Sequence, residues 1–583
     1  MPYKQYNNNQ SFLSFPLLIE VPDDHIVRVI SWFIDAISPA LFAQINPDNR
    51  GASAYDPRMM LKMLLFAYLR NQRSGAQIQR LAEENIPMKW LIGNPDIVPN
   101  ARTINRFRSA EQTGELIKVL YLQFRLLLQS LKLLDDEEIF IDGTKITADA
   151  NKYSFVWRRS VERFEPILDE KANDLFNELM QIDPSIDLHS EAADLLARLN
   201  EVVDEIDSRV EYLDEVVANE RTIPGGSKNK RQRRSLKHLS HLLHNDLIPR
   251  KTKYVEANKV FGQRNSFSKT DYDATFMMMK EDPMNNGQTK PGYNIQIATQ
   301  NQFVLYYDVT QRPTDQRTLI PFLEKIDIPF RYIVADAGYG SQANYEYVLH
   351  QRHAVPLIPY TMYLKELSRK YQKDLTKRQN WQYNGLLDRY IDNIGVQFGR
   401  VREYDKVDKS TGFVKHFLKY EALPGCNPEQ DRLTQTERGS QRTISVNIDW
   451  ESQKSLVRRE LATPDGRLIY GMRKFEVEPV FGNLKRNLKF NRYSVRGLQA
   501  VTNETGIVLM AGNLKKLAIL INVYPDLLEK MLKWEFICRT FKPEIWHYFS
   551  TFDKLGKKRP NILKIFRMLG RLIFVNGNYV PAT

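Results

Sequence analysis

The chain has 583 residues, 42% of them hydrophobic, a formal net charge of +13 and a pI near 9.3. This length predicts several structural units, and the basic charge favours a polyanionic partner, most simply nucleic acid, although basic residues also serve as a solubilising surface. Two cysteines, Cys426 and Cys538, exclude a disulfide framework and a cysteine-rich zinc site, and the histidines form no HExxH spacing.

The composition also bears on the compartment. Residues 1–11 are polar and rich in Asn, unlike a signal peptide. The most apolar late stretch, 506–523, is interrupted by Asn513, Lys515 and Lys516, so we expect a core helix and no membrane contact. Because few cysteines fit a reducing environment, we expect a cytoplasmic protein.

Residues 1–130 predict a helical N-terminal domain for DNA binding or dimerisation. Asp56-Pro57 is an N-cap followed by Pro at the first helical position, which starts a helix over 58–69. The helices expected over 74–83 and 101–108 fit a helix-turn-helix reader of DNA. A packing or dimerisation domain with a solvated basic face fits equally well. Under the first reading, the arginines that contact DNA are Arg106 and Arg108.

A buried strand that ends in an acid is expected over 138–146. Ile139, Phe140 and Ile141 have strand propensity, and Asp142-Gly143 marks the point where the strand stops. Taken alone, an Asp before a Gly is more often a turn residue than a catalyst. A catalytic role for Asp142 therefore depends on matching acids elsewhere in the chain.

The segment 157–258 predicts a long charged helical insertion. Its apolar residues alternate steps of four and three, as in the seam of a coiled coil or an antiparallel helical hairpin: Leu199, Val202, Ile206, Val210, Leu213 and Val217. The segment is acidic up to Glu220 and basic after the Pro224-Gly225-Gly226 turn. The basic run is either a solvated face or a contact with the DNA backbone.

Strands and helices then alternate over 259–360. A hairpin is expected from 292–298 and 303–309, followed by a helix, the strand 332–335 that ends in Asp336, a second helix, and the strand 355–358. With the insertion removed, this is the order of an RNase H-like α/β domain with a mixed five-stranded sheet. In such a sheet the first and fourth strands are neighbours, so Asp142 and Asp336 are expected to meet.

The remainder contains a second insertion over 361–463, a third part of the core over 464–523 and a helical basic tail over 524–583. The second insertion predicts strands at 398–402 and 413–423 and a loop at 424–441, with no recognisable chemistry. In the core, Glu478 is expected near the start of a helix, where Pro479 is tolerated. Lys485, seven residues later, is then two turns along on the same side.

The chemistry of these acids is that of a hard cation site. Carboxylates bind Mg²⁺ or Mn²⁺, and two such ions in one active site support phosphoryl transfer. Asp142 bridges the ions in this hypothesis, with Asp336 and Glu478 completing one shell each. Arg473 and Lys485 hold phosphates, and Tyr470 stacks on a base or binds a phosphate.

Several blocks carry a family resemblance. They are Ile141-Asp142-Gly143-Thr144-Lys145 with Ala150-Asn151-Lys152, Lys290-Pro291-Gly292-Tyr293-Asn294, Ala335-Asp336-Ala337-Gly338-Tyr339, and Val477-Glu478-Pro479-Val480-Phe481-Gly482-Asn483-Leu484-Lys485. The chain resembles a DDE transposase of bacterial insertion sequences, close to the IS1182 group of the IS4-like transposases. Tyr55-Asp56-Pro57 and Thr103 to Arg108 resemble the helical domain that precedes the catalytic core in this group.

The resemblance implies that Asp142, Asp336 and Glu478 are the metal-binding triad, and that Tyr470, Arg473, Glu478 and Lys485 form a Tyr-Arg-Glu-Lys signature. The chain departs from the pattern because four residues, not three, separate Arg473 from Glu478, so Lys474 competes for the arginine role. Glu476 is a weaker alternative to Glu478. Relatives often carry several cysteines in the second insertion, whereas this chain has only Cys426 there.

We therefore expect a transposase that binds the terminal inverted repeats of its element, cuts DNA with two Mg²⁺ or Mn²⁺ ions per active site, and joins the freed ends to target DNA. By analogy it acts as a homodimer on double-stranded DNA. Two alternatives are an inactive relict that only binds DNA and an RNase H-like nuclease that cuts without joining.

Overall fold

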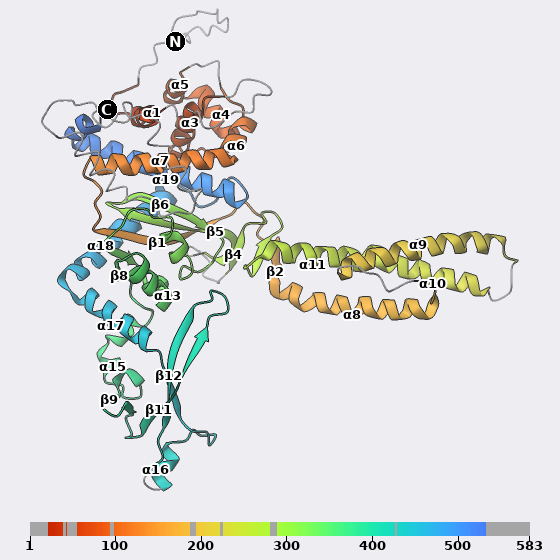
Figure 1. Ribbon diagram of the computed structural model, residues 1–583. Helices are drawn as coiled ribbons and strands as arrows, with labels where there is room; N and C mark the ends of the chain where they lie inside the picture. Colours follow the sequence, from red (N-terminus) through yellow and green to blue (C-terminus); the bar gives the residue numbers. More distant parts are fainter. Residues whose placement is uncertain are drawn as a thin grey trace, which may run out of the picture.

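The computed structural model describes residues 21–38, 42, 55–93, 98–186, 194–221, 226–279, 288–425 and 428–531. A central sheet is covered on one side by a layer of helices, while a helical arm and a second, smaller sheet extend from it (Figure 1). Most of the basic tail predicted for 524–583 lies outside the described residues, as do Cys426, Cys538 and part of the turn at Pro224-Gly225-Gly226.

The N-terminal region is helical, as expected. Asp56 caps the second of its helices by accepting a hydrogen bond from the Arg58 amide, with Pro57 at the first helical position. A short helix lies within the break predicted between the two helices of the helix-turn-helix. The helices are α1 (Ile26–Ala36), α3 (Pro57–Leu69), α4 (Gly75–Glu84), α5 (Ile86–Ile92), α6 (Ala101–Ser109) and α7 (Glu111–Ser130).

The central sheet is mixed and has six strands, one more than predicted. Its strands are β1 (Glu138–Thr147), β4 (Thr275–Met278), β5 (Thr289–Gln300), β6 (Phe303–Thr310), β7 (Tyr332–Ala335) and β8 (Val355–Leu357). β1 pairs antiparallel with β5 and parallel with β7, and β7 pairs parallel with β8. Gly292 of β5 pairs with Thr147 of β1 and with Thr275 of β4, so the extra strand lies on the edge of β5 away from β1, as β6 does.

The register brings the first two predicted acids together. Ile141 of β1 is the parallel partner of Ala335 of β7, so Asp142 and Asp336 are the next residues on adjacent strands. The neighbourhood of these strands is confirmed. The strand does not stop at Gly143, however, because β1 continues to Thr147 by pairing with β5.

Helices cover the sheet. α19 (Leu498–Val523) lies between the N-terminal helices and β6 (Figure 1), and the Asn513 side-chain amide donates to the Val304 carbonyl at 2.8 Å. α19 is the one helix among the described residues that is long and apolar enough to cross a membrane, but it is packed into the core. The other elements around the sheet are α12 (Leu319–Leu323), η2 (Ala337–Tyr339), α13 (Gln342–Glu346), η3 (Tyr347–Gln351), α18 (Pro464–Gly482) and η5 (Asn483–Asn487).

The first insertion forms an arm that projects from the sheet (Figure 1). It has its own apolar core, which includes Leu199, Val202, Ile206 and Leu213 of the predicted seam. Its helices are α8 (Arg158–Ile182), α9 (Leu195–Asn219), α10 (Lys228–Leu242), η1 (Leu243–Leu247) and α11 (Ile248–Phe261), and its base carries the strands β2 (Phe155–Trp157) and β3 (Ser266–Ser268).

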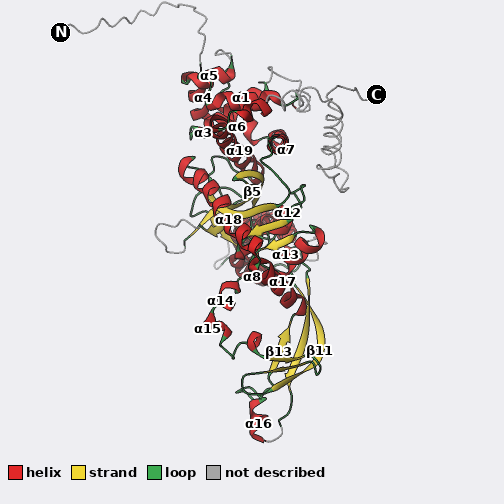
Figure 2. Ribbon diagram, turned by 90° about the vertical axis from the view of Figure 1, so that its left-hand side faces the viewer, coloured by secondary structure: helices red, strands yellow, loops and turns green. Residues whose placement is uncertain are grey.

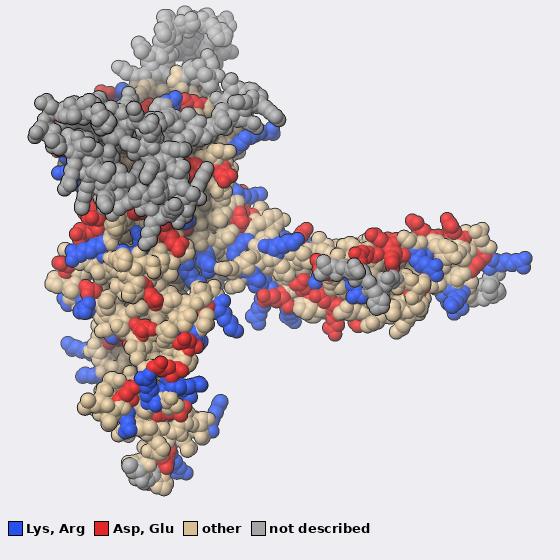
Figure 3. Space-filling model, viewed as in Figure 1, with Lys and Arg blue, Asp and Glu red and all other residues tan. Residues whose placement is uncertain are grey.

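Charges of both signs are interspersed along this arm (Figure 3). Arg233 and Lys237 of α10 both pair with Asp214 of α9. Lys251 of α11 pairs with Glu165 and Asp169 of α8. Part of the basic run therefore serves to hold the arm together.

The second insertion contains a five-stranded antiparallel sheet in the order β13-β12-β11-β10-β9, visible below the central sheet in Figure 2. The two predicted strands are present as β11 and β12. The loop predicted at 424–441 instead contains the helix α16 and an isolated antiparallel bridge between Gln435 and Gln441. The elements are α14 (Tyr363–Glu366), α15 (Arg369–Gln372), η4 (Arg378–Asn380), β9 (Gln382–Asn384), β10 (Arg389–Ile391), β11 (Gln397–Val407), β12 (Val414–Ala422), α16 (Pro428–Leu433), β13 (Thr443–Val446) and α17 (Ile448–Ala462).

Candidate active site

Asp142 lies in the middle of β1 and is largely buried, with 8% of its surface exposed. Its Oδ1 accepts a hydrogen bond from the Gly143 amide at 2.7 Å, and its Oδ2 accepts one from Arg473 Nη1 at 3.3 Å. A carboxylate is costly to bury unless it is paired. The arginine of α18 therefore supplies the positive charge that this position requires.

Asp336 follows the last residue of β7 and begins the short 3-10 turn η2. Its Oδ1 accepts a hydrogen bond from the Gly338 amide at 2.9 Å, which fixes the carboxylate at the carboxyl end of the strand. Two residues of the turn, Gly338 and Tyr339, belong to the motif that identified this block. The side chain is partly exposed, so it is accessible to a ligand.

A buried polar network that the sequence analysis did not identify lies next to these acids. Asp315 Oδ1 accepts hydrogen bonds from the side-chain amides of Asn294, at 2.7 Å, and Gln296, at 3.1 Å. The Tyr339 hydroxyl donates to Gln296 Oε1. Burial raises the pKa of Tyr339 well above its usual value, and the neighbouring carboxylates of Asp315, Asp142 and Asp336 add to the effect.

This network defines an acidic region beside the middle of β1 and the carboxyl end of β7. The available signal was the alternation of Asn294 and Gln296 with Ile295 and Ile297 in the predicted strand 292–298. Both are buried, with at most 1% of their surface exposed. A buried amide normally has a specific partner, and here that partner is Asp315.

Helix α18 brings the third group of predicted residues to the sheet. Arg473 contacts Asp142, and Tyr470, one turn earlier, lies near both Arg473 and Asp336. Burial raises the pKa of Tyr470, while the nearby guanidinium of Arg473 opposes the shift. The structure therefore brings Tyr470 and Arg473 together with the two aspartates.

Glu478 is on the same helix but not near its start. α18 begins at Pro464, where Thr463 caps it, so Glu478 lies in the penultimate turn and Pro479 lies inside the helix. The prediction of a helix that begins near Glu478 is therefore wrong. Glu478 is exposed and follows Arg473 by five residues, or about 7.5 Å along the axis.

The alternative acid, Glu476, has a different environment. It is buried, with 7% of its surface exposed, and its Oε2 accepts a hydrogen bond from the Gln302 amide at 2.6 Å, in the turn between β5 and β6. Residues two positions apart on an α-helix are separated by about 200° around its axis, so Glu476 and Glu478 lie on different sides of α18. Glu476 is accounted for by its contact with this turn.

The predicted lysines have unequal positions. Lys474 is exposed on α18. Lys485 lies in the π-helical turn η5, which continues α18. Because a π-turn is wider than an α-turn, the spacing of 3.6 residues that placed Lys485 on the side of Glu478 does not hold across it. The helix ends at Asn487, and the next helix is α19, which begins at Leu498.

The two arginines assigned to DNA in the N-terminal domain also differ. Arg106 is exposed on α6. Arg108 is buried, with 3% of its surface exposed, and its guanidinium donates to Ser494 Oγ at 2.8 Å and to the Tyr68 hydroxyl at 3.2 Å. It also lies 3.7 Å from Glu504 of α19. The prediction that Arg108 contacts DNA is therefore wrong, because its side chain is buried and hydrogen-bonded inside the molecule.

The acids suit a hard divalent cation by their chemistry, since they offer carboxylate oxygens without histidine or cysteine. Among the described residues, no three Asp, Glu, His or Cys side chains converge closely enough to hold a metal ion. Asp142 and Asp336 are neighbours by register, whereas Glu478 does not join them in a cluster of three among the described residues.

Two family models match the chain. One, described as a transposase DDE domain, covers residues 265–514, and the other, described as a transposase domain (DUF772), covers residues 15–110. Asp336 and Glu478 lie inside the first match, whereas Asp142 precedes it on the far side of the arm. No curated protein and no solved structure shows a significant match to the sequence.

The mixed α/β core and these matches give the chain the domain order of a transposase, with a DUF772 domain followed by a DDE domain. This order is consistent with an IS1182-type transposase, the group that the sequence motifs indicated.

Proposed function

We propose that the protein binds the terminal inverted repeats of an insertion sequence, cuts the DNA at the ends and joins the freed strands to target DNA. The observation that supports this most strongly is the register of β1 and β7, which makes Asp142 and Asp336 neighbours beside Arg473. The matches to two transposase domains support the same function.

The catalytic core is proposed to be RNase H-like. In support, β6, β5 and β1 form an antiparallel unit, and β1, β7 and β8 are parallel. This is the strand order in which a first-strand Asp and a fourth-strand Asp share one edge. β4 is then an addition at the far edge, where it does not disturb the acids.

Each residue has a proposed role. Asp142, Asp336 and Glu478 would hold two Mg²⁺ or Mn²⁺ ions, which when bound activate the attacking oxygen and stabilise the leaving oxygen in phosphoryl transfer. Arg473 neutralises Asp142 in this structure and is positioned to bind a phosphate when the acid acquires another partner. Tyr470, Lys474 and Lys485 contribute contacts to the DNA strand. Glu478 has to approach the aspartates, which a shift of the last turns of α18 would provide.

The remaining proposals concern the setting of the reaction. Two ends must be processed together, so we expect a homodimer on double-stranded DNA. Arg106 of α6 is proposed to contact DNA, as part of the N-terminal transposase domain. A cytoplasmic location fits a protein that acts on the DNA of a bacterial element.

A cleavage and joining assay tests this function. Labelled DNA carrying the inverted repeats that flank the coding region is incubated with Mg²⁺ and a target plasmid, using the intact protein and Asp142→Asn. We expect cut and joined products with the intact protein only, and equal DNA binding by both.

The outcomes separate the alternatives. Cutting without joining would favour a nuclease, and binding without metal-dependent cutting by the intact protein would favour a relict. Equal cleavage by Asp142→Asn would remove Asp142 from the active site.

A further inference from the structure

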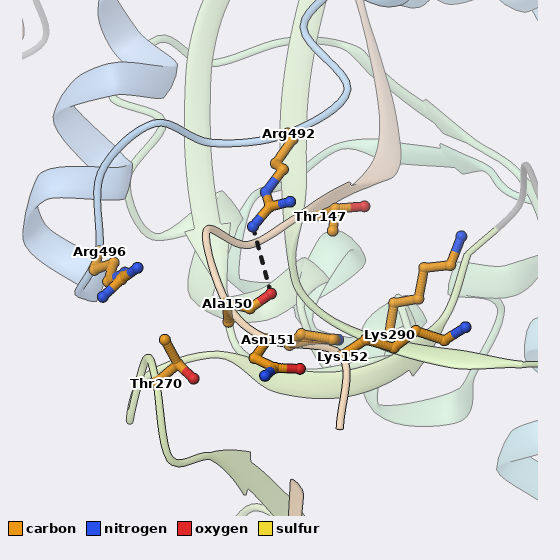
Figure 4. Close-up of a pocket in the computed structure, with 9 residues that line it drawn as sticks. Thr147, Ala150, Asn151, Lys152, Thr270, Lys290, Arg492 and Arg496 are labelled. Carbon is orange, nitrogen blue, oxygen red and sulfur yellow. Dashed lines mark hydrogen bonds between the residues drawn. The ribbon is translucent and has the colours of Figure 1, made fainter. Parts of the chain in front are cut away.

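A cavity of about 590 Å³ lies just beyond the acids, where β1 ends. Four cationic side chains line it, and Figure 4 shows Lys152 and Lys290 extending on one side while Arg492 and Arg496 approach from the loop before α19. Lys152 and Lys290 belong to two of the blocks that carry the family resemblance, and the proposed function assigns no role to the cavity.

Three segments far apart in the chain build this cavity and are hydrogen-bonded to one another. The Tyr493 amide donates to the Thr147 carbonyl at 2.9 Å, which ties the loop of Arg492 to the last residue of β1. The Ala148 amide donates to the Pro291 carbonyl at 2.9 Å, which ties the start of β5 to the same place. The position of the cavity is thus set relative to Asp142 through the strand that carries both.

Asp149 holds the two arginines in place. Its Oδ1 accepts from Arg492 Nη2 at 3.1 Å, and its Oδ2 accepts from Arg496 Nε at 3.0 Å (Figure 4 shows both arginines). Asp149 thus pairs with two of the four cationic side chains that line the cavity. Within the described part of the chain, neither Lys152 nor Lys290 forms an ion pair.

This combination selects a polyanion. Guanidinium groups bind phosphate oxygens in pairs and ammonium groups act as point charges, so the cavity suits a phosphate. Arg492 and Arg496 keep 56% and 54% of their side-chain surface exposed, which leaves the cavity open to a strand passing over it. An enclosed site for a small molecule would instead cover most of its ligand.

We propose that this cavity binds a phosphate of the DNA backbone at a fixed distance from the cut. The inference rests on the proposed function. Thr147 is five residues beyond Asp142, and a strand rises about 3.3 Å per residue, so the two lie about 16 Å apart. With about 3.4 Å of helix axis per phosphate on each strand, the bound phosphate is about five base pairs from the scissile one.

The first test measures the salt dependence of DNA binding. The double variant Lys152→Gln, Lys290→Gln is compared with the intact protein and with Lys118→Gln, Lys325→Gln, in which two exposed lysines on α7 and after α12 are changed. We expect the cavity variant to bind more weakly and to reduce the slope of log K against log [NaCl] by about 1, because one neutralised phosphate contributes about 0.9. The control variant should match the intact protein.

The second test needs no variant and locates the phosphate. Single methylphosphonates, which are uncharged, are placed along the end DNA on each strand. We expect a loss of affinity at a position about five base pairs from the cut, and no such loss with the cavity variant.

The outcomes distinguish the two proposals. If the intact protein binds and cuts DNA while the cavity variant keeps the full salt slope, or no methylphosphonate near that position weakens binding, the cavity does not bind the backbone and the transposase function stands. If the intact protein does not bind the end DNA, the proposed function fails and the inference fails with it.

Discussion

Gly143 shows how closely the groups around Asp142 are packed. A Cβ at this position would lie 2.5 Å from Gln296 Nε2 and 2.8 Å from Asp315 Oδ1, both shorter than any normal contact. The Asp-Gly pair in the motif is therefore explained by the approach of the polar network to the strand. It does not mark a turn, since β1 continues for four more residues.

The burial of Glu476 can be tested by the pH dependence of stability. Burial raises the pKa of Glu476 above its usual value, although the Gln302 amide and Lys516 oppose the shift. A carboxyl group whose pKa is raised in the folded state contributes stability that is complete below the unfolded pKa and is lost as the pH rises through the folded pKa.

We therefore expect Glu476→Gln, which cannot ionise, to gain stability relative to the intact protein between pH 4 and pH 8. The measurement is the urea midpoint of both proteins across this range. Parallel curves would show that burial does not raise the pKa of Glu476.

The sequence was informative about residues whose role depends on neighbours along the chain. Asp142 and Asp336 were identified because each follows an apolar run, and the pairing of β1 with β7 makes them neighbours. Arg108 was assigned wrongly because the sequence predicts that it lies on a helix but not that it forms a buried ion pair with Glu504. Asp315 was missed for the same reason, since its partners Asn294 and Gln296 are fixed only by the fold.

At the scale of elements, α18 illustrates a misplaced boundary. Thr463-Pro464 is a capping signal of the same kind as Asp56-Pro57, and the Thr463 hydroxyl accepts a hydrogen bond from the Gly466 amide at 3.0 Å. The start was instead placed near Pro479, because proline is normally found in the first turn. Of the two prolines, Pro464 marks the start of the helix, because it follows the capping residue Thr463.

The arm was predicted more completely, because its seam follows a helical repeat. Its apolar core is separate from that of the central sheet and the helical layer. Packing within the arm is therefore local, and damage to it is expected to remain local.

We expect Leu199→Ala to destabilise the arm by about 2–5 kcal/mol, because Leu199 is fully buried in its core. Hydrogen exchange should speed up in α8, α9 and α10 while the amides of β1 and β7 stay protected. Glu201→Ala, at an exposed position of the same helix, is the control. Faster exchange throughout the central sheet would contradict the independence of the arm.

At the scale of the whole molecule, buried charges join the N-terminal helices to α19. Arg108 of α6 and Glu504 of α19 form an ion pair whose side chains are 3% and 0% exposed. The Tyr68 hydroxyl donates to Glu504 Oε1 at 2.7 Å, and the Ser494 amide donates to Glu504 Oε2 at 2.9 Å. The two family-matched domains thus share one core.

Removal of one partner from this pair leaves the other buried and unpaired. We expect Arg108→Ala to lower the free energy of unfolding by about 3–5 kcal/mol. Arg106→Ala, exposed on the same helix, should leave stability nearly unchanged and weaken DNA binding. Urea denaturation and DNA titration of both variants check this, and an Arg108→Ala protein of full stability with weak DNA binding would restore the original assignment of Arg108.

The overall arrangement was the least predictable level. The strand order of the core followed from the sequence of apolar segments, but the direction of the arm and the seating of α19 between two domains depend on contacts such as Asn513 with Val304, which no local pattern encodes. The four cations of the cavity were visible as basic residues, yet their convergence depends on three segments meeting.

The central claim is that Asp142, Asp336 and Glu478 act together on DNA, and the most direct test compares two neighbouring glutamates. Labelled, pre-cut end DNA is incubated with target plasmid and Mg²⁺, using Glu478→Gln and Glu476→Gln. We predict that strand joining is lost in Glu478→Gln and retained in Glu476→Gln, with equal binding of the end DNA. Joining by Glu478→Gln at the rate of the intact protein would contradict the account and require a different third acid.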